Sequence, residues 1–378
     1  MPEENTKKRI GLITQSNLIN FGSDLQAYSL FKYLQELGFD VEIIDYWIKD
    51  LLDIYNRKYV PVKFEAKAPL RIARNIVTFF NSKNYDKMKN AFADFRKDWI
   101  FSRQRYVGEE AIEQNPPKYD FYVAGSDCIW HPEYLVPARA LHFAENINSP
   151  KISYAPSVSF SGEISREKKE YMKGLLSNID FLSCREKAGA EFLQNLLKRD
   201  VQTVLDPVFL HDKNWWADIA GEEPIIKGDY IFSYVIHPDK NIKNIIRHLR
   251  KIFNLPVVLV VFDLKTAFLL PHDKVVKSIG PKEFLNLIRH AKRSVVSSFH
   301  GAAFSAIFKK DCYFIRHSPT DTRTPDLHSR LGIKNKIIYD IDGINMEETD
   351  YSQTDALLAR ELASSEKYLK NALGIKNV

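Results

Sequence analysis

The sequence has few cysteines and no long apolar run, and these two absences exclude several classes of protein. Its 378 residues include three cysteines, Cys128, Cys184 and Cys312, which lie far apart and match no metal-site spacing. So sparse and odd a count fits a reducing cytoplasm better than a disulfide framework. No stretch of about 18 apolar residues suggests a membrane-spanning helix, and the charged start MPEENTKKRIGLI lacks the apolar core of a signal peptide. We therefore expect a cytoplasmic protein.

Several catalytic signatures are missing as well. The sequence contains neither the G-x-S-x-G elbow of serine hydrolases nor the G-x-G-x-x-G or P-loop patterns that bind nucleotides. Its ten histidines form no H-x-x-x-H pair, so we expect no metal site, and no motif calls for an organic cofactor. No recognisable nucleic-acid module occurs either, so nucleic acid is not an expected partner.

What is present is a composition rich enough for large cores and an uneven distribution of charge. Hydrophobic residues make up 45% of the chain, and at about 150 residues per domain we expect two domains. The net charge is +6, but residues 57–106 alone hold thirteen Lys or Arg against four Asp or Glu. This segment is interpreted either as a solvated helical insertion or as a basic face for an anionic membrane or a phosphate-bearing acceptor.

Strand-like and helix-like segments alternate along both halves of the chain, which predicts an α/β fold with two Rossmann-like domains. We expect a first domain over residues 1–215, with the basic helical insertion at 50–113, a second over 225–350, and a final helix within 351–378. The polar, turn-rich segment 211–229 is the predicted boundary. Helices are expected at 25–38, 165–178, 187–199, 241–254, 281–293 and 352–373, and strands at 41–47, 121–123, 229–236, 255–262 and 311–316.

The stretch SSFHG, residues 297–301, joins a strand-like segment to a helix-like one. A helix N-terminus offers free N–H groups and a positive dipole end, so Ser297, Ser298 and Gly301 would form an anion pocket there. His300 at its mouth would donate to phosphate or move a proton near neutral pH. The alternative is that His300 caps the helix or fills a polar core position.

A second polar turn, GSDCIW at residues 125–130, also follows a strand-like segment. Gly125 would allow a close approach of the backbone, and Ser126 or Asp127 would cap the next helix. In a functional interpretation, Asp127 accepts a hydrogen bond from a sugar hydroxyl or acts as a base. Both interpretations remain open from these residues alone.

Basic side chains elsewhere are candidates for anion binding. Arg185, in SCREK, would present its planar fork to a carboxylate or phosphate, or else pair with Glu186 or another acid. Four residues lie late in the chain, and most of them are expected to be solvated: Arg316, His317, Arg323 and Arg330. The LDPVF stretch at 205–209 is interpreted as a turn at the domain join rather than as a site.

Taken in order, these segments resemble the polysaccharide pyruvyl transferase family. The resemblance is carried by the opening strand with its N-x-G loop at Asn20 and LQA-Y helix, and by the blocks GSD-x-x-W, SYA-S, S-x-RE, LDP and SFHG, between residues 8 and 331. Departures occur at Ser23, Asp24, Cys128 and His131, which puts the identity of the acceptor in doubt more than that of the donor.

The resemblance implies a GT-B-like fold, phosphoenolpyruvate as donor and a saccharide acceptor, free, nucleotide-linked or lipid-linked. It implies a pyruvate ketal as product, with Arg185, the SSFHG turn and Arg323 binding the donor. His300 would be the general acid or the proton donor to departing phosphate, and Asp127 would orient or deprotonate an acceptor hydroxyl. Two alternatives stay open: a GT-B glycosyltransferase that uses a nucleotide sugar, and a carbohydrate-binding homologue without turnover.

Overall fold

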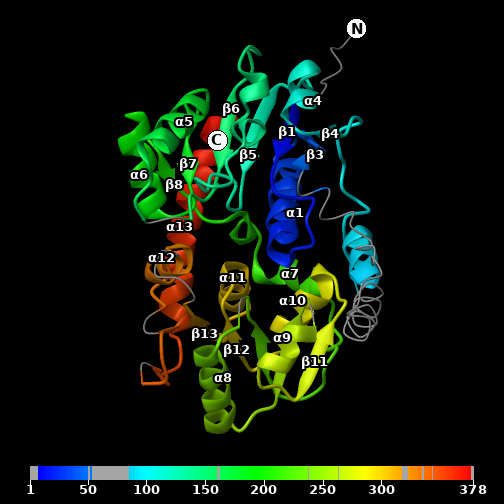
Figure 1. Cartoon of the computed structure of the whole chain (residues 1–378), viewed down its shortest axis with the longest axis vertical. Coiled ribbons are helices and arrows are strands. Elements are labelled where there is room, and N and C mark those ends of the chain that lie inside the picture. Colours follow the sequence, from blue (N-terminus) through cyan, green and yellow to red (C-terminus); the bar gives the residue numbers. More distant parts are fainter. Residues whose placement is uncertain are drawn as a thin grey trace, which may run out of the picture.

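The computed structural model describes residues 7–49, 52, 85–159, 162–236, 238–262, 264–316, 322–333, 336–342 and 344–375, and contains two parallel sheets in separate halves of the molecule (Figure 1). The first sheet has the order β2-β1-β5-β6. Its strands are β1 (Arg9–Ile13), β2 (Asp40–Ile43), β5 (Phe121–Gly125) and β6 (Lys151–Tyr154). All of them pair in parallel, as expected for a Rossmann-like half.

Short strands continue this first sheet at both edges. On one side β3 (Tyr46–Trp47) pairs with β4 (Tyr106–Val107), and a single bridge joins Ile43 to Phe101. On the other side β7 (Ser183–Cys184) pairs with β8 (Gln202–Thr203), and a bridge joins Ile152 to Phe181. These extensions bring the segment after β7 to the same sheet edge as the other strand ends.

The second sheet has the order β11-β10-β9-β12-β13-β14, again entirely parallel. In chain order this is 3-2-1-4-5-6, the arrangement of doubly wound dinucleotide-binding folds. The strands are β9 (Ile231–Tyr234), β10 (Val257–Val261), β11 (Lys274–Lys277), β12 (Arg293–Val296), β13 (Asp311–Ile315) and β14 (Ile337–Ile338). The predicted α/β fold with two Rossmann-like halves is confirmed.

Helices cover the sheets close to where apolar spacing predicts them. In α8 (Lys240–Phe253), buried Ile242, Ile245 and Leu249 recur at helical spacing, and Asp239 caps the first turn. The other α-helices with printed bounds are α1 (Phe21–Glu36), α4 (Glu109–Gln114), α5 (Arg166–Leu176), α6 (Lys187–Leu197), α7 (Lys213–Ala220), α9 (Leu264–Leu269), α10 (Pro281–Arg289), α11 (Phe299–Ile307), α12 (Arg323–Arg330) and α13 (Tyr351–Ala372). Short 3-10 turns occur at η1 (Pro137–Ala140), η2 (His142–Ala144) and η3 (Pro207–Phe209).

Helix α1 begins four residues earlier than its apolar spacing predicts. Asn20 is the N-cap, and its Oδ1 accepts hydrogen bonds from the backbone N–H groups of Gly22 and Ser23, at 3.0 and 3.2 Å. The cap satisfies N–H groups that the first turn would otherwise leave without partners. The predicted loop through residue 24 is therefore partly helical, and the start of α1 points at the space between the two halves.

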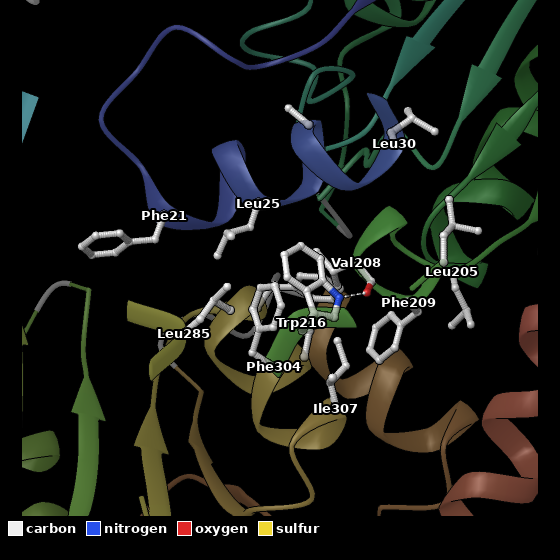
Figure 2. Packing of buried hydrophobic residues seen from close by; sticks show 14 of the residues in the cluster. Phe21, Leu25, Leu30, Leu205, Val208, Phe209, Trp216, Leu285, Phe304 and Ile307 are labelled. Atoms are coloured by element: carbon white, nitrogen blue, oxygen red, sulfur yellow. Dashed lines mark hydrogen bonds between the residues drawn. The ribbon is translucent and has the colours of Figure 1, made fainter. Parts of the chain in front are cut away.

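The predicted boundary segment contains a helix, α7, which buries Trp216, Ala217 and Ala220, and continues as bends over residues 222–228. Trp216 is fully buried and donates its indole N–H to the carbonyl of Val208 at 2.8 Å. Its ring packs edge-on against Phe304 of α11. Figure 2 shows Trp216 among side chains from both halves, including Leu25 and Leu285. One hydrophobic cluster thus joins the halves.

The long helix α13 confirms the predicted C-terminal helix and ties the second half back to the first (Figure 1). Ser365 accepts a hydrogen bond from the backbone N–H of Leu205 at 2.9 Å, and Tyr368 donates to the carbonyl of Ser153 at 2.8 Å. Arg330, expected to be solvated, is instead buried. It pairs with Glu361 and donates to the carbonyl of Arg185.

Part of the basic segment can be located. Residues 50, 51 and 53–84, most of the predicted insertion, lie outside the described residues, as does His317. Residues 85–95 are helical, and Arg96 forms a two-pronged ion pair with the buried Asp24, at 2.7 and 2.6 Å. The contact with an anionic membrane stays a prediction. None of the described helices combines the length and apolar character needed to cross a bilayer.

Candidate active site

The loops that follow strands of both sheets meet around a small cavity of about 90 Å³. The first half contributes Asn20 and Gly22, at the start of α1, and Asp127, after β5. The second half contributes Ser297, Ser298 and His300, after β12, with Arg323 at the start of α12. The carboxyl ends of parallel strands are where open α/β sheets bind ligands, so this cavity is the candidate active site.

His300 is the second residue of α11 and is held firmly by its neighbours. Ser298 is the N-cap of this helix, and its Oγ accepts a hydrogen bond from the N–H of Gly301 at 3.0 Å. The helix thus begins at Phe299, inside the SSFHG stretch. A Cβ added to Gly22 would lie 2.1 Å from His300 Nδ1, so only glycine at this position of α1 leaves room for the imidazole.

Asp206, which the sequence analysis treated only as part of a turn, is the anionic partner of His300. Its Oδ2 lies 3.5 Å from His300 Nε2 and 2.5 Å from an Nη of Arg185. Its Oδ1 accepts from Val208 N–H, which is the turn role that LDPVF suggests. Burial works to raise the pKa of Asp206, but the charges of His300 and Arg185 lower it well below its usual range. The carboxyl group is therefore ionised.

Asp127 also lines the cavity, and its backbone lies in the left-handed region with φ +65°. Its Oδ2 accepts a hydrogen bond from Ser23 Oγ at 2.5 Å, and its Oδ1 accepts from Cys128 N–H at 2.8 Å. Burial would raise the pKa of Asp127, yet the charges of His300 and Arg185 and the bond from Ser23 together lower it. Asp127 is thus an ionised acceptor next to the cavity.

Arg185 and Arg323 lie at different depths. Arg185 is 3% exposed, pairs with Asp206 and stacks over the ring of Phe299 at 4.2 Å. It therefore supports the cavity from behind, as the ion-pair alternative in the sequence analysis allowed, although with Asp206 rather than Glu186. Arg323 lines the cavity and donates to Cys128 Sγ at 2.9 Å.

The remaining predicted residues shape the cavity through packing. A Cβ on Gly125 would lie 2.0 Å from the carbonyl oxygen of Tyr154, so β5 and β6 approach closely there. Ser126 is fully buried and donates to the carbonyl of Ala155. Ser297 Oγ accepts from Ile236 N–H at 2.8 Å, which ties the loops after β9 and β12 together. The N–H of Gly301 is taken by Ser298, so ligand contacts by Gly125, Ser126 and Gly301 remain predictions.

Two larger cavities adjoin the small one, and Asn20 lines all three. One, of about 510 Å³, opens on the side of the first half and shares Asp127. The other, of about 520 Å³, lies at the carboxyl ends of β9 and β10 and shares Tyr234 and Ile236. The cleft therefore has room for a donor and for a larger acceptor. Within the described residues, His, Cys, Asp and Glu form no group of three able to hold a metal ion.

Comparison with known families gives one match over most of the chain. The model of the polysaccharide pyruvyl transferase family matches residues 20–319. That range includes Asn20, Asp127, Arg185, Asp206 and His300, so the residues gathered at the cavity lie within the matched region. No curated protein sequence matches significantly.

Solved structures with the same architecture belong to proteins of low sequence identity. Staphylococcus aureus MnaA, in complex with UDP, is 12% identical, with a TM-score of 0.53 and coverage of 98% of both chains. The UDP-GlcNAc 2-epimerase of Methanocaldococcus jannaschii, with UDP-GlcNAc and UDP, is 16% identical (TM-score 0.49; 96% of this chain and 98% of that one). The glycosyltransferase SnogD of Streptomyces nogalater is 13% identical (TM-score 0.45; 98% and 99%). At this identity the likeness to MnaA concerns the fold alone.

Proposed function

Because the chain belongs to the polysaccharide pyruvyl transferase family, we propose that it transfers pyruvate from phosphoenolpyruvate to a sugar of a polysaccharide precursor. The product is a pyruvate ketal that bridges two sugar hydroxyl groups, and phosphate is released. The observation that carries this proposal is the position of His300, which lines a small cavity together with the ionised Asp127 and has its Nε2 3.5 Å from the ionised Asp206. The reaction needs no nucleotide, and we assign it to the cytoplasmic assembly of exopolysaccharide or cell-wall material.

The donor carries a phosphate and a carboxylate, so its site must supply positive charge and hydrogen-bond donors. Arg323 lines the cavity, and the N-terminus of α11 presents the positive end of its dipole beside Ser297 and Ser298. Arg185 contributes by balancing Asp206, so that the buried carboxylate does not repel the donor. We propose that the phosphate lies against the start of α11 and that Arg323 binds the donor from the α12 side.

His300 is proposed to move the protons that the reaction requires. The enol double bond takes up a proton at its terminal carbon, which leaves an oxocarbenium-like centre at the neighbouring carbon. One sugar hydroxyl bonds to that centre, the C–O bond to phosphate breaks, and the second hydroxyl closes the ketal. Of the two protons that the hydroxyls lose, one restores the group that protonated the enol carbon and the other leaves with the phosphate. His300 donates either to the enol carbon or to the departing phosphate, and the carboxylate of Asp206 lies 3.5 Å from its Nε2.

Asp127 is proposed to orient the acceptor. Its lowered pKa keeps it ionised near neutral pH, which makes it a hydrogen-bond acceptor for a sugar hydroxyl rather than a strong base. Its left-handed backbone and the hydrogen bond from Ser23 hold the carboxylate in one position. Holding a reacting group in the correct geometry accelerates the reaction. The acceptor hydroxyls would approach from the side opposite His300.

The test is phosphate release from phosphoenolpyruvate with a panel of free, nucleotide-linked and lipid-linked sugars, for the wild type, His300→Ala and the control His272→Ala. His272 is exposed, next to the amino end of β11, and its replacement should leave the rate unchanged. We expect sugar-dependent release that falls at least about a hundredfold in His300→Ala only. No release with any sugar, together with binding of a nucleotide sugar, would instead support a glycosyltransferase.

A further inference from the structure

A second cationic side chain lies in the cleft, away from His300, and the reaction described above does not use it. Arg139, in η1, is 6% exposed. One of its Nη atoms donates to the side-chain carbonyl of Gln15, and its Nε is buried without a hydrogen-bond partner. A buried guanidinium with an unpaired N–H costs folding free energy unless a ligand or a carboxylate forms a hydrogen bond with it.

The carboxylates near Arg139 do not form a hydrogen bond or an ion pair with its guanidinium within the described residues. Within the described part of the chain no carboxylate forms an ion pair with Arg139, and Glu109 and Asp127 act on it only through space. Glu109 is occupied elsewhere, since its two carboxylate oxygens accept from the hydroxyl of Tyr46 and the N–H of Ala138. Burial lowers the pKa of Arg139, although the charges of Asp127 and Glu109 work to raise it.

Arg139 lines the cavity of about 510 Å³ on the side of the first half, together with Gln15. Asp127 and Asn20 also line it, at its junction with the small cavity that holds His300. Tyr134, at its rim, is 64% exposed, and its ring stacks on His131 with the centroids 4.8 Å apart. An exposed aromatic ring held by a stacked neighbour offers the flat apolar surface that sugar rings pack against.

We propose that this cavity is the acceptor subsite and that Arg139 binds an anionic group carried by the acceptor, either a uronic carboxylate or a glycosyl phosphate. The inference rests on the proposed function and narrows its substrate class to acidic saccharides. The sugar ring packs on Tyr134, its reacting hydroxyls meet Asp127, and its anionic group reaches Arg139. The planar guanidinium suits both kinds of anion, because each presents two oxygens to a pair of N–H groups.

The donor is a less suitable occupant for Arg139. The cavity that contains His300, Ser298 and Arg323 does not include Arg139, and Asp127 lies at the junction of the two cavities. A donor anion on Arg139 would therefore lie outside the cavity that contains the proton source, His300. We therefore assign donor binding to Arg323 and the start of α11, and acceptor binding to Arg139.

The test is a calorimetric comparison of three matched ligands in the gluco, galacto and manno series: a methyl hexoside, the methyl hexuronide and the hexose 1-phosphate. We expect the wild type to prefer one of the two charged ligands at least about tenfold. Arg139→Gln should abolish that preference, and Arg139→Lys should keep part of it, because lysine retains the charge but loses the fork. Equal binding of neutral and charged ligands by the wild type, or an unchanged preference in Arg139→Gln, would overturn the proposal.

Two further measurements distinguish a failure of this acceptor subsite from a failure of the proposed pyruvyl transfer. Phosphoenolpyruvate binding should be the same in the wild type and in Arg139→Gln, and weaker binding in the variant would assign Arg139 to the donor and overturn the inference. Tyr134→Ala, at an exposed position that does not threaten folding, should weaken all bound saccharides, whereas Tyr134→Phe should not. If phosphoenolpyruvate does not bind the wild type at all, pyruvyl transfer fails, while an Arg139-dependent preference for charged saccharides would still establish the subsite.

Discussion

The two walls of the cleft differ in chemistry. The wall from the first half is built of charged and hydrogen-bonded side chains, with Arg185 and Asp206 buried and Asp127 partly buried. The wall from the second half places the rings of Tyr234 and Phe284 next to the cavity, together with His300 and Arg323. The first half thus supplies the carboxylates of the site, and the second half supplies an imidazole and a guanidinium.

The comparison shows that the active site exists only when the halves are correctly docked. Phe21, at the start of α1, stacks between Phe262 and Phe284 of the second half, with centroids 5.0 and 4.5 Å away. The next residue, Gly22, contacts the ring of His300. An aromatic contact and a catalytic contact are therefore adjacent in the chain, and packing between the halves sets the position of His300.

The largest expected effect comes from Asp206→Asn, which removes the negative charge of a buried carboxylate in the wall from the first half. The change leaves Arg185 buried beside a neutral amide, and removing one partner of a buried ion pair costs about 3–5 kcal/mol of folding free energy. His300 also loses its anionic partner, so phosphate release should fall as well. Urea unfolding and steady-state kinetics measure the two losses. The control is Asp355→Asn, whose pair with Lys309 is exposed and should cost less than about 1 kcal/mol.

The same wall predicts how stability depends on acidity. Because the pKa of Asp206 is lowered in the folded protein from an ordinary 3.8, its stabilising contribution is present above about pH 4 and is lost as the pH falls below that value. Unfolding free energy measured from pH 7 down to pH 3 should therefore decline at the acid end in the wild type. An equally steep decline in Asp206→Asn would assign the effect to other carboxyl groups.

A smaller effect should follow from displacing His300 without changing any charge. In Gly22→Ala the new Cβ would lie 2.1 Å from the imidazole, so the ring must shift. A displacement near 1 Å at a reacting group can cost about a hundredfold in rate. Turnover number and thermal unfolding are the measurements. Gly174→Ala is the matched control, since it lies inside α5 and nothing lies within 4 Å of its added Cβ. An unchanged turnover number in Gly22→Ala would show that the contact between Gly22 and His300 is not needed for catalysis.

The smallest effect tests whether the cap of α1 has a role beyond the helix. Asn20→Ala removes an N-cap and should cost about 1 kcal/mol of stability. Ser165→Ala removes the cap of α5, outside the three cavities, and should cost a similar amount. Only Asn20→Ala should also raise the KM for the acceptor, because Asn20 lines every cavity of the cleft. Equal KM values in the two variants would reduce Asn20 to a structural cap.

Periodicity and strand-end reasoning predicted most of the fold and the centre of the site. The apolar spacing located α8 and β10 within a few residues, and Asp127 and His300, which follow strand-like segments in the sequence, both line one cavity. These predictions succeed because they depend on local pattern and on the parallel order of strands.

What the sequence did not predict depends on contacts between distant residues. Asp206 lies in a stretch that satisfies a turn, so its second carboxylate oxygen, which contacts Arg185 and His300, had no local signal beyond the LDP block. Trp216 lies in a polar segment, and its burial follows from the docking of two halves. Arg330 is buried because α13 brings Glu361 to it. Such partners are chosen by tertiary structure, which overrides local composition.

The path of α13 has a consequence for how the protein is made. This helix follows both sheets in the chain, yet Leu369, Ala372 and Leu373 belong to the same hydrophobic cluster as Leu12 of β1. A ribosome therefore releases the segment that completes the first half's core only after it has translated the whole of the second half. We expect the nascent first half to stay protease-sensitive until α13 emerges, unlike domains that fold in turn during synthesis.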